Sequence, residues 1–187
     1  MNTTEKTQPG QRVVPLVIIA PVRDEQKYVR LTLESLASQT WQPQECIFVD
    51  DGSTDATADI VNEFSAKHPW IRLVKRENRG FRQVGKGVIV TFDFGQEQIL
   101  NKDWRYITKL DGDMSFGPRY IEKIISKLEA DPKLAACSGK VFRPEGSDFV
   151  EEFMIDEMVA GQFKMYKREA FEDIGGFRQT ILWDTID

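Results

Sequence analysis

The run Leu16-Val17-Ile18-Ile19-Ala20 decides the fold class, because it is apolar at every position. A strand with one face in water alternates apolar and polar residues, whereas a strand covered by helices on both faces is apolar throughout. From Glu25 to Gln39 the apolar residues change to the spacing of one helix face. A buried strand followed by an amphipathic helix predicts a βα-repeating α/β fold with a mainly parallel sheet.

The rest of the chain repeats this alternation. Further strands are predicted over Cys46–Val49, Ile71–Val74, Arg105–Leu110, Leu134–Cys137 and Phe163–Tyr166. A helix is expected after Ser53 or Thr54, either of which can cap its amino end. Another is expected to begin at Pro118, since proline favours the first helical position. The pattern predicts a Rossmann-like, mostly parallel sheet flanked by helices.

Length and composition favour a single globular domain. The chain has 187 residues, of which 41% are hydrophobic, which is enough for one core. Met1–Arg12 is polar and contains Pro9-Gly10, so we expect a flexible tail before a domain over residues 13–187. The net charge of −5 provides no basic field for a phosphate backbone, so nucleic acid is not an expected partner.

Cysteine usage favours a reducing compartment, and hydropathy gives no sign of a membrane-spanning helix. Cys46 and Cys137 stand in apolar stretches, where a buried thiol is the usual interpretation. The longest apolar run, Val13–Val22, is far shorter than the roughly 20 residues of a membrane-spanning helix. We therefore expect a cytoplasmic protein, with any membrane association supplied by residues beyond Asp187.

Polar clusters follow three of the predicted strands. They are Pro21-Val22-Arg23-Asp24-Glu25, Asp50-Asp51-Gly52-Ser53 and Asp111-Gly112-Asp113. The carboxyl ends of parallel strands meet at one edge of a sheet, which is where ligands bind in open α/β folds. Each cluster alone is also what turns and helix starts prefer. The prediction of a site therefore depends on their convergence.

Asp111 and Asp113 flank a glycine, so in an extended segment their carboxylates would point to the same side. Two such hard oxygen donors suit Mg²⁺ or Mn²⁺ bridging a diphosphate. Asp111, Asp113 and Glu122 also match part of a calcium-loop spacing. Phe116, however, stands where that loop requires glycine.

Other motifs carry weaker signals. Gly80 to Lys86 has the spacing of a phosphate-binding P-loop, but Gly87 stands where that loop needs Ser or Thr. The same glycines and Lys86 can still border the phosphates of a nucleotide. His68, the only histidine, is expected at a helix end, where its charge would suit the helix dipole. Histidine triads and histidine-rich metal sites are thereby excluded.

Taken in order, the clusters resemble the inverting family 2 glycosyltransferases of the GT-A fold. The resemblance is carried by Leu16–Pro21 with Arg23-Asp24-Glu25, Ser38-Gln39-Thr40, Val49–Asp55, Leu110–Asp113, and Gly175-Gly176-Phe177 with Trp183-Asp184. It implies a metal-dependent transfer of a sugar from a nucleotide-diphosphate sugar to an acceptor hydroxyl. The donor would be a UDP- or GDP-sugar, the cofactor Mn²⁺ or Mg²⁺, and the acceptor a glycan, a lipid or another hydroxyl.

The resemblance also implies roles for individual residues. Donor binding would fall to Pro21, Arg23, Glu25, Asp51, Lys86 and Asp111, with Asp51 reading the base. Asp111 would face the ribose or the metal, and Asp113 would bind the metal. Asp184 would be the catalytic base that deprotonates the acceptor hydroxyl.

The sequence departs from the family pattern in places. Asp24 and Lys86 stand where Asn is common, and Trp183 replaces an acidic residue, so Asp187 competes with Asp184 as the base. The chain ends at Asp187, so we expect a truncated catalytic domain. Two alternatives remain open: a donor-binding domain without turnover, and a sugar-phosphate nucleotidyltransferase.

Overall fold

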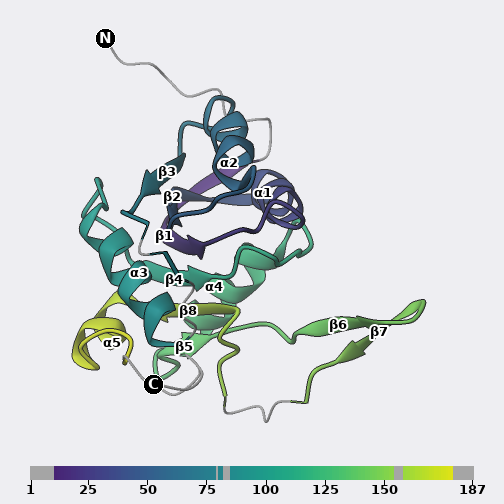
Figure 1. Ribbon diagram of the computed structural model, residues 1–187. Coiled ribbons are helices and arrows are strands. Elements are labelled where there is room, and N and C mark those ends of the chain that lie inside the picture. The colour runs from purple at the N-terminus through teal and green to yellow at the C-terminus, as the bar shows by residue number, and fades with distance from the viewer. Residues whose placement is uncertain (1–10, 79, 82–84, 154–157, 179–187) are drawn as a thin grey trace.

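The computed structural model describes residues 11–78, 80–81, 85–153 and 158–178. Its centre is a six-stranded sheet with the strand order β3-β2-β1-β4-β8-β5 (Figure 1). The strands are β1 (Arg12–Val22), β2 (Trp41–Asp50), β3 (Ile71–Lys75), β4 (Tyr106–Leu110), β5 (Ala136–Cys137) and β8 (Phe163–Lys167). The pairs among β1, β2, β3 and β4 are parallel, whereas β8 runs antiparallel to β4 and to β5. The predicted mainly parallel α/β sheet is confirmed.

Helices cover both faces of the sheet (Figure 1). They are α1 (Val29–Ala37), α2 (Thr57–Ser65), α3 (Lys86–Glu97), α4 (Tyr120–Ala130) and α5 (Arg168–Asp173). Alternate residues of β1 enter two cores: Leu16, Ile18 and Ala20 pack with α1, α2 and α4, and Val17 and Ile19 pack with α3 and α5. The apolar run of β1 is therefore buried on both faces, as its composition predicts.

A two-stranded hairpin lies outside this sheet. β6 (Phe142–Glu145) pairs with β7 (Asp148–Glu151), and all the residues of both strands are exposed. It stands away from the sheet in Figure 1. Neither this hairpin nor α3 was expected from the sequence.

Several expected boundaries are wrong. The helix expected from Glu25 begins at Val29, because residues 23–28 form the loop that follows β1. The helix expected from Pro118 begins at Tyr120 after a turn. Arg12, the last residue of the expected tail Met1–Arg12, pairs with Trp41 in the sheet.

The expected cap of the second helix is also wrong. α2 begins at Thr57, and neither Ser53 nor Thr54 caps it. Instead the Asp55 carboxylate accepts hydrogen bonds from the Thr57 amide at 2.9 Å and its hydroxyl at 2.5 Å. Burial disfavours the charge on Asp55, but hydrogen bonds from Thr57 and Gln26 outweigh it and lower the Asp55 pKa.

His68 does not act as the expected charged residue at a helix end. Its ring lies against Phe64, with the ring centroids 6.2 Å apart, and against Trp70 at 5.9 Å. Burial, with a smaller contribution from Lys67, lowers the His68 pKa and favours the neutral imidazole.

The two cysteines are free thiols; Cys46 is buried, as expected, whereas Cys137 is only half-buried. Burial raises the pKa of both, so the unreactive thiol form is favoured. Within the described ranges, no helix has the length and apolar character needed to cross a bilayer.

Candidate functional site

A cavity of about 50 Å³ opens where β1 and β2 end. Pro21, Val22, Arg23, Glu25, Asp51, Gly87, Val88 and Thr91 line it. Because Val22 is paired with Asp50, the residues that follow the two parallel strands emerge side by side. Pro21, Arg23, Glu25 and Asp51 thus meet at one cavity, which joins two of the three clusters that were expected to converge.

The Asp51 carboxylate is held by an arginine that the sequence analysis missed. Asp51 is only 7% exposed, and Arg76 Nη1 lies 2.9 Å from its Oδ1. The same nitrogen donates to Thr91 Oγ1 at 2.8 Å, so Arg76 joins β3 to α3 across the cavity wall. Its amide also donates to the Asp50 carbonyl at 2.9 Å. A signal existed: Arg76 is the first residue after β3, the strand next to β2.

Arg23 ties the first loop to the second. Its Nη1 donates to the Asp51 carbonyl at 2.6 Å, and its Nη2 donates to Asn78 Oδ1 at 3.1 Å. With these two acceptors engaged, the guanidinium is fixed at the rim rather than free to swing into solvent. The positive charge of Arg23 therefore stays at the cavity, where it suits an anionic ligand.

The loops after β1 and β2 are bound together by reciprocal hydrogen bonds. The Asp24 amide donates to Ser53 Oγ at 3.0 Å, and the Thr54 amide donates to Asp24 Oδ1 at 2.7 Å. Asp24 has a φ of 55°, a left-handed conformation that Asp and Asn tolerate better than most residues. This explains why an Asp can stand here where the family often has Asn.

Two glycines of the clusters are required by close approach. Gly52 has a φ of 85°, and a Cβ there would lie 2.6 Å from Asn78 Cγ. At Gly112 a Cβ would lie 2.6 Å from Val22 Cγ1 and 3.5 Å from Glu25 Cγ. The Asp-Gly-Asp segment is therefore pressed against the end of β1, and Thr32 Oγ1 holds it by donating to the Gly112 carbonyl at 2.8 Å.

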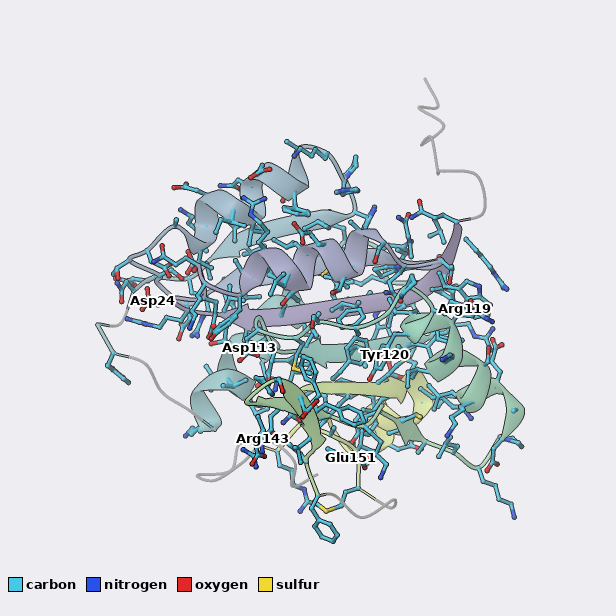
Figure 2. The ribbon with its side chains drawn as sticks, turned by 90° about the vertical axis from the view of Figure 1, so that its right-hand side faces the viewer. Asp24, Asp113, Arg119, Tyr120, Arg143 and Glu151 are labelled. Atoms are coloured by element: carbon cyan, nitrogen blue, oxygen red, sulfur yellow. The ribbon has the colours of Figure 1, made fainter. Side chains whose placement is uncertain are left out.

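Asp111 and Asp113 leave β4 in a turn, not in the expected extended segment. The alternation argument that aimed both carboxylates to one side is therefore wrong. The Asp111 side chain is 33% exposed and lies 2.5 Å from Lys109 Nζ, whereas Asp113 is exposed. Figure 2 shows Asp113 and Asp24 on the same side of the molecule.

The carboxylates of this turn suit a metal ion that is also bound by the phosphates of the substrate. Among the residues that the structure describes, no group of three or more His, Cys, Asp or Glu side chains could hold a metal ion. Mg²⁺ is commonly bound by one or two carboxylates together with substrate phosphates, so Asp111 and Asp113 fit that kind of site.

Lys86 is the first residue of α3, and its neighbour Gly87 lines the cavity. The amino end of a helix carries partial positive charge, which places Lys86 where phosphates are favoured. Lys86 itself is not among the lining residues.

The proposed base Asp184, with Trp183 and Asp187, lies outside the described residues. Before them, Gly175 and Gly176 adopt φ values of 75° and 83°, as expected of a Gly-Gly turn.

A wider hollow of about 530 Å³ lies at the opposite edge of the sheet, around the start of β4. Its lining includes Trp104, Tyr106 and Arg168 but none of the predicted site residues. Arg168 stacks on Trp104, 4.5 Å from the ring centroid, and pairs with Glu172 at 2.7 Å. The candidate site is therefore assigned to the smaller cavity at the carboxyl edge, where Pro21, Arg23, Glu25 and Asp51 meet.

Known proteins share this architecture. S. aureus TarS 1-349 in complex with UDP has a TM-score of 0.67 at 19% identity, covering 88% of this chain and 50% of that chain. Mannosyltransferase PcManGT from Pyrobaculum calidifontis, in complex with GDP-Man and Mn²⁺, has a TM-score of 0.62 at 19% identity, covering 96% and 53%. At this identity the likeness shows the fold alone, which is the GT-A type.

The sequence comparisons show the family. Hyaluronan synthase of Pasteurella multocida is 27% identical over 180 residues, covering 90% of this chain and 18% of the synthase. The chain thus spans less than a fifth of that relative. The profile of glycosyl transferase family 2 matches residues 17–154, which include the three strand-end clusters. On this match over most of its length, the chain belongs to glycosyl transferase family 2.

Proposed function

We propose that this chain binds a nucleotide-diphosphate sugar at the carboxyl edge of its sheet and transfers the sugar to an acceptor hydroxyl with inversion. The observation that supports this most is the meeting of Pro21, Arg23, Glu25 and Asp51 at one cavity. Gly112 then brings the Asp111–Asp113 turn against the same loop. Family membership supports the reaction class.

The base of the donor would be read by Asp51. A carboxylate accepts hydrogen bonds from the ring N–H groups of uracil or guanine, so Asp51 suits UDP or GDP. Arg76 and the amide hydrogen bond from Asp51 to the Val22 carbonyl fix the carboxylate in place. Proteins of the same fold bind UDP and GDP-Man, which carry these two bases.

The diphosphate would lie between the cationic rim and the acidic turn. Arg23 and Lys86 would pair with phosphate oxygens, while Asp113, with Asp111 beside it, would hold Mn²⁺ or Mg²⁺. When bound, such a metal stabilises the charge that grows on the departing nucleoside diphosphate.

Asp184 would act as the general base. It would accept the proton of the acceptor hydroxyl as that oxygen attacks the anomeric carbon from the face opposite the leaving group. The bond to the nucleoside diphosphate breaks as the new glycosidic bond forms, which inverts the configuration.

Calorimetric titration of UDP, GDP, CDP and dTDP, each with and without Mn²⁺, tests the donor site. One diphosphate should bind in a metal-dependent manner, and Asp51→Asn and Asp113→Asn should each weaken binding by about tenfold or more. Asp103→Asn, an exposed carboxylate before β4, is the matched control and should bind like the parent.

Three results would count against the proposal or narrow it. If the nucleoside diphosphate binds equally well with and without Mn²⁺, the proposed role of Asp113 as a metal ligand is wrong. Equal loss in the Asp103 control would show a nonspecific charge effect. If the parent binds the donor but transfers no sugar, and Asp184→Asn leaves donor binding unchanged, a binding domain without turnover is favoured.

A further inference from the structure

Lys109 is a lysine placed inside the core. It lies on β4, where every residue is buried, and it is only 2% exposed. Lysine is rarely buried to this extent unless its ammonium group is paired, because removing the charge from water is costly. Its position on a central strand therefore needs a specific partner.

That partner is the first carboxylate of the acidic turn. Lys109 Nζ lies 2.5 Å from Asp111 Oδ1 and donates to the Gly161 carbonyl at 2.9 Å. The Asp111 amide donates to the Gln162 carbonyl at 2.9 Å, so its backbone is held as well. Asp113, two residues further along the turn, is exposed.

The ion pair makes the two aspartates unequal as metal ligands. An ammonium group at 2.5 Å occupies a lone pair of Asp111 and offsets its negative charge. It also repels any divalent cation that approaches the same carboxylate, and this repulsion is strong because Lys109 is screened from water. Asp113 is exposed, so water weakens any such repulsion at its carboxylate.

We propose that Lys109 is a positioning residue that holds the Asp111 carboxylate away from metal ligation, so that Asp113 is the carboxylate that binds the divalent cation. Asp111 is then left to accept hydrogen bonds from the donor. This inference depends on the proposed donor site and adds to it the residue that divides the work between the two aspartates.

A purely structural role for Lys109 makes different predictions. If Lys109 served only to join β4 to the loop at Gly161, its replacement would lower stability and leave the metal affinity of a folded variant unchanged. Metal affinity therefore separates the two roles, and it can be measured without turnover.

The experiment counts free Mn²⁺ by electron paramagnetic resonance while the protein is titrated, with Mn²⁺ alone and with the nucleoside diphosphate that binds. Lys109→Met should bind Mn²⁺ about tenfold more tightly than the parent, because an unscreened like charge has gone. Asp111→Asn should change Mn²⁺ affinity by less than about twofold, whereas Asp113→Asn should abolish most of it. The double variant Lys109→Met/Asp111→Asn should lose the gain.

Lys164→Met is the matched control. Lys164 is paired with Lys109 in register across β4 and β8 and is 1% exposed, so its replacement removes an equally buried charge. Its effect on Mn²⁺ affinity should be clearly smaller than that of Lys109→Met. An equal effect would show a general loss of positive charge and overturn the specific role of Lys109.

Asp111→Asn keeps the inference testable even if Lys109→Met does not fold, since Asp111 is partly exposed and Asn has nearly the same shape. If Asp111→Asn weakens Mn²⁺ binding as much as Asp113→Asn while the nucleotide still binds the parent, this inference is wrong and the donor site stands. If the parent shows no metal-dependent nucleotide binding, the proposed function itself fails.

Discussion

Replacing Gly112 by alanine should both destabilise the protein and disturb the candidate site. The new Cβ would lie 2.6 Å from Val22 Cγ1, about 1 Å inside the usual separation of carbon atoms in contact. Val22 is 3% exposed, so its methyl group has little space into which to move. Overpacking of this kind costs about 1–3 kcal/mol.

The expected cost can be turned into a thermal shift. In a domain of this size, each kcal/mol lowers the midpoint of unfolding by about 2–4 °C, so Gly112→Ala should lower it by about 2–12 °C. The displacement also moves the acidic turn relative to Glu25, which lines the cavity. We therefore expect nucleoside diphosphate affinity to fall by about tenfold.

Gly117→Ala is the matched control. Gly117 lies in the same loop, and a Cβ added to it would have no atom within 4 Å. Like Gly112, it is not among the glycines with positive φ. Its replacement should have little effect on thermal unfolding or on calorimetric titration of the nucleotide. Any large loss there would point to chain stiffness in this loop rather than to a contact.

Val22→Ala supplies the second control, because it removes the Cγ1 atom that the new methyl group would meet. In the double variant, part of the cost of Gly112→Ala should be recovered, with a coupling energy of about 0.5–3 kcal/mol in urea unfolding. If Gly112→Ala behaves like Gly117→Ala, or if the two changes are additive, the steric argument for this glycine is refuted.

Two further predictions concern charged and titratable side chains. Arg76→Leu should cost about 1–3 kcal/mol in urea unfolding, because it takes from the buried Asp51 carboxylate an ion-pair partner at 2.9 Å, and it should weaken nucleotide binding in calorimetry. The exposed variant Arg143→Leu on β6 should do neither. For His68, NMR titration should give a pKa below the ordinary value of about 6.5, because burial disfavours the imidazolium ion. The unfolded state then binds more protons than the folded state, so the contribution of His68 to stability is present above about pH 6.5 and is lost as the pH falls through the folded pKa. His68→Gln should remove this dependence, and a measured His68 pKa above 6.5 would restore the idea of a charge at the helix end.

The helix α3 could not be predicted from its local sequence. Lys86–Glu97 is rich in β-branched and aromatic residues and contains Gly87 and Gly95, all poor helix formers. The tertiary contact explains Gly95, since a Cβ there would lie 2.6 Å from Ile19 Cγ2 and 2.7 Å from Val49 Cγ2. The helix lies so close to the sheet that packing outweighs intrinsic propensity.

The β6–β7 hairpin was missed for a different reason. Its strands are short and exposed, and Pro144 lies within β6, so the usual signals of a buried strand are absent. Gly146, with a φ of 64°, makes the turn between them. A pair of strands without a buried face leaves little pattern in the sequence.

Residue pattern and chain direction are enough to predict the α/β class and the edge at which the candidate site lies. Consecutive apolar residues at 16–20 require burial on both faces, and parallel strands must end at the same edge, so the clusters around Arg23 and Asp51 had to be neighbours. These conclusions follow from local periodicity and chain direction alone.

The pairing of charged side chains, by contrast, depends on the three-dimensional arrangement of the chain. Arg76, just after β3, reaches Asp51 after β2, and Lys109, buried on β4, pairs with Asp111 directly after that strand. Such pairs depend on strand order, on turn geometry and on burial, which strengthens an ion pair by excluding water. None of these quantities is encoded in residue spacing, so the partners of Asp51 and Asp111 became visible only in three dimensions.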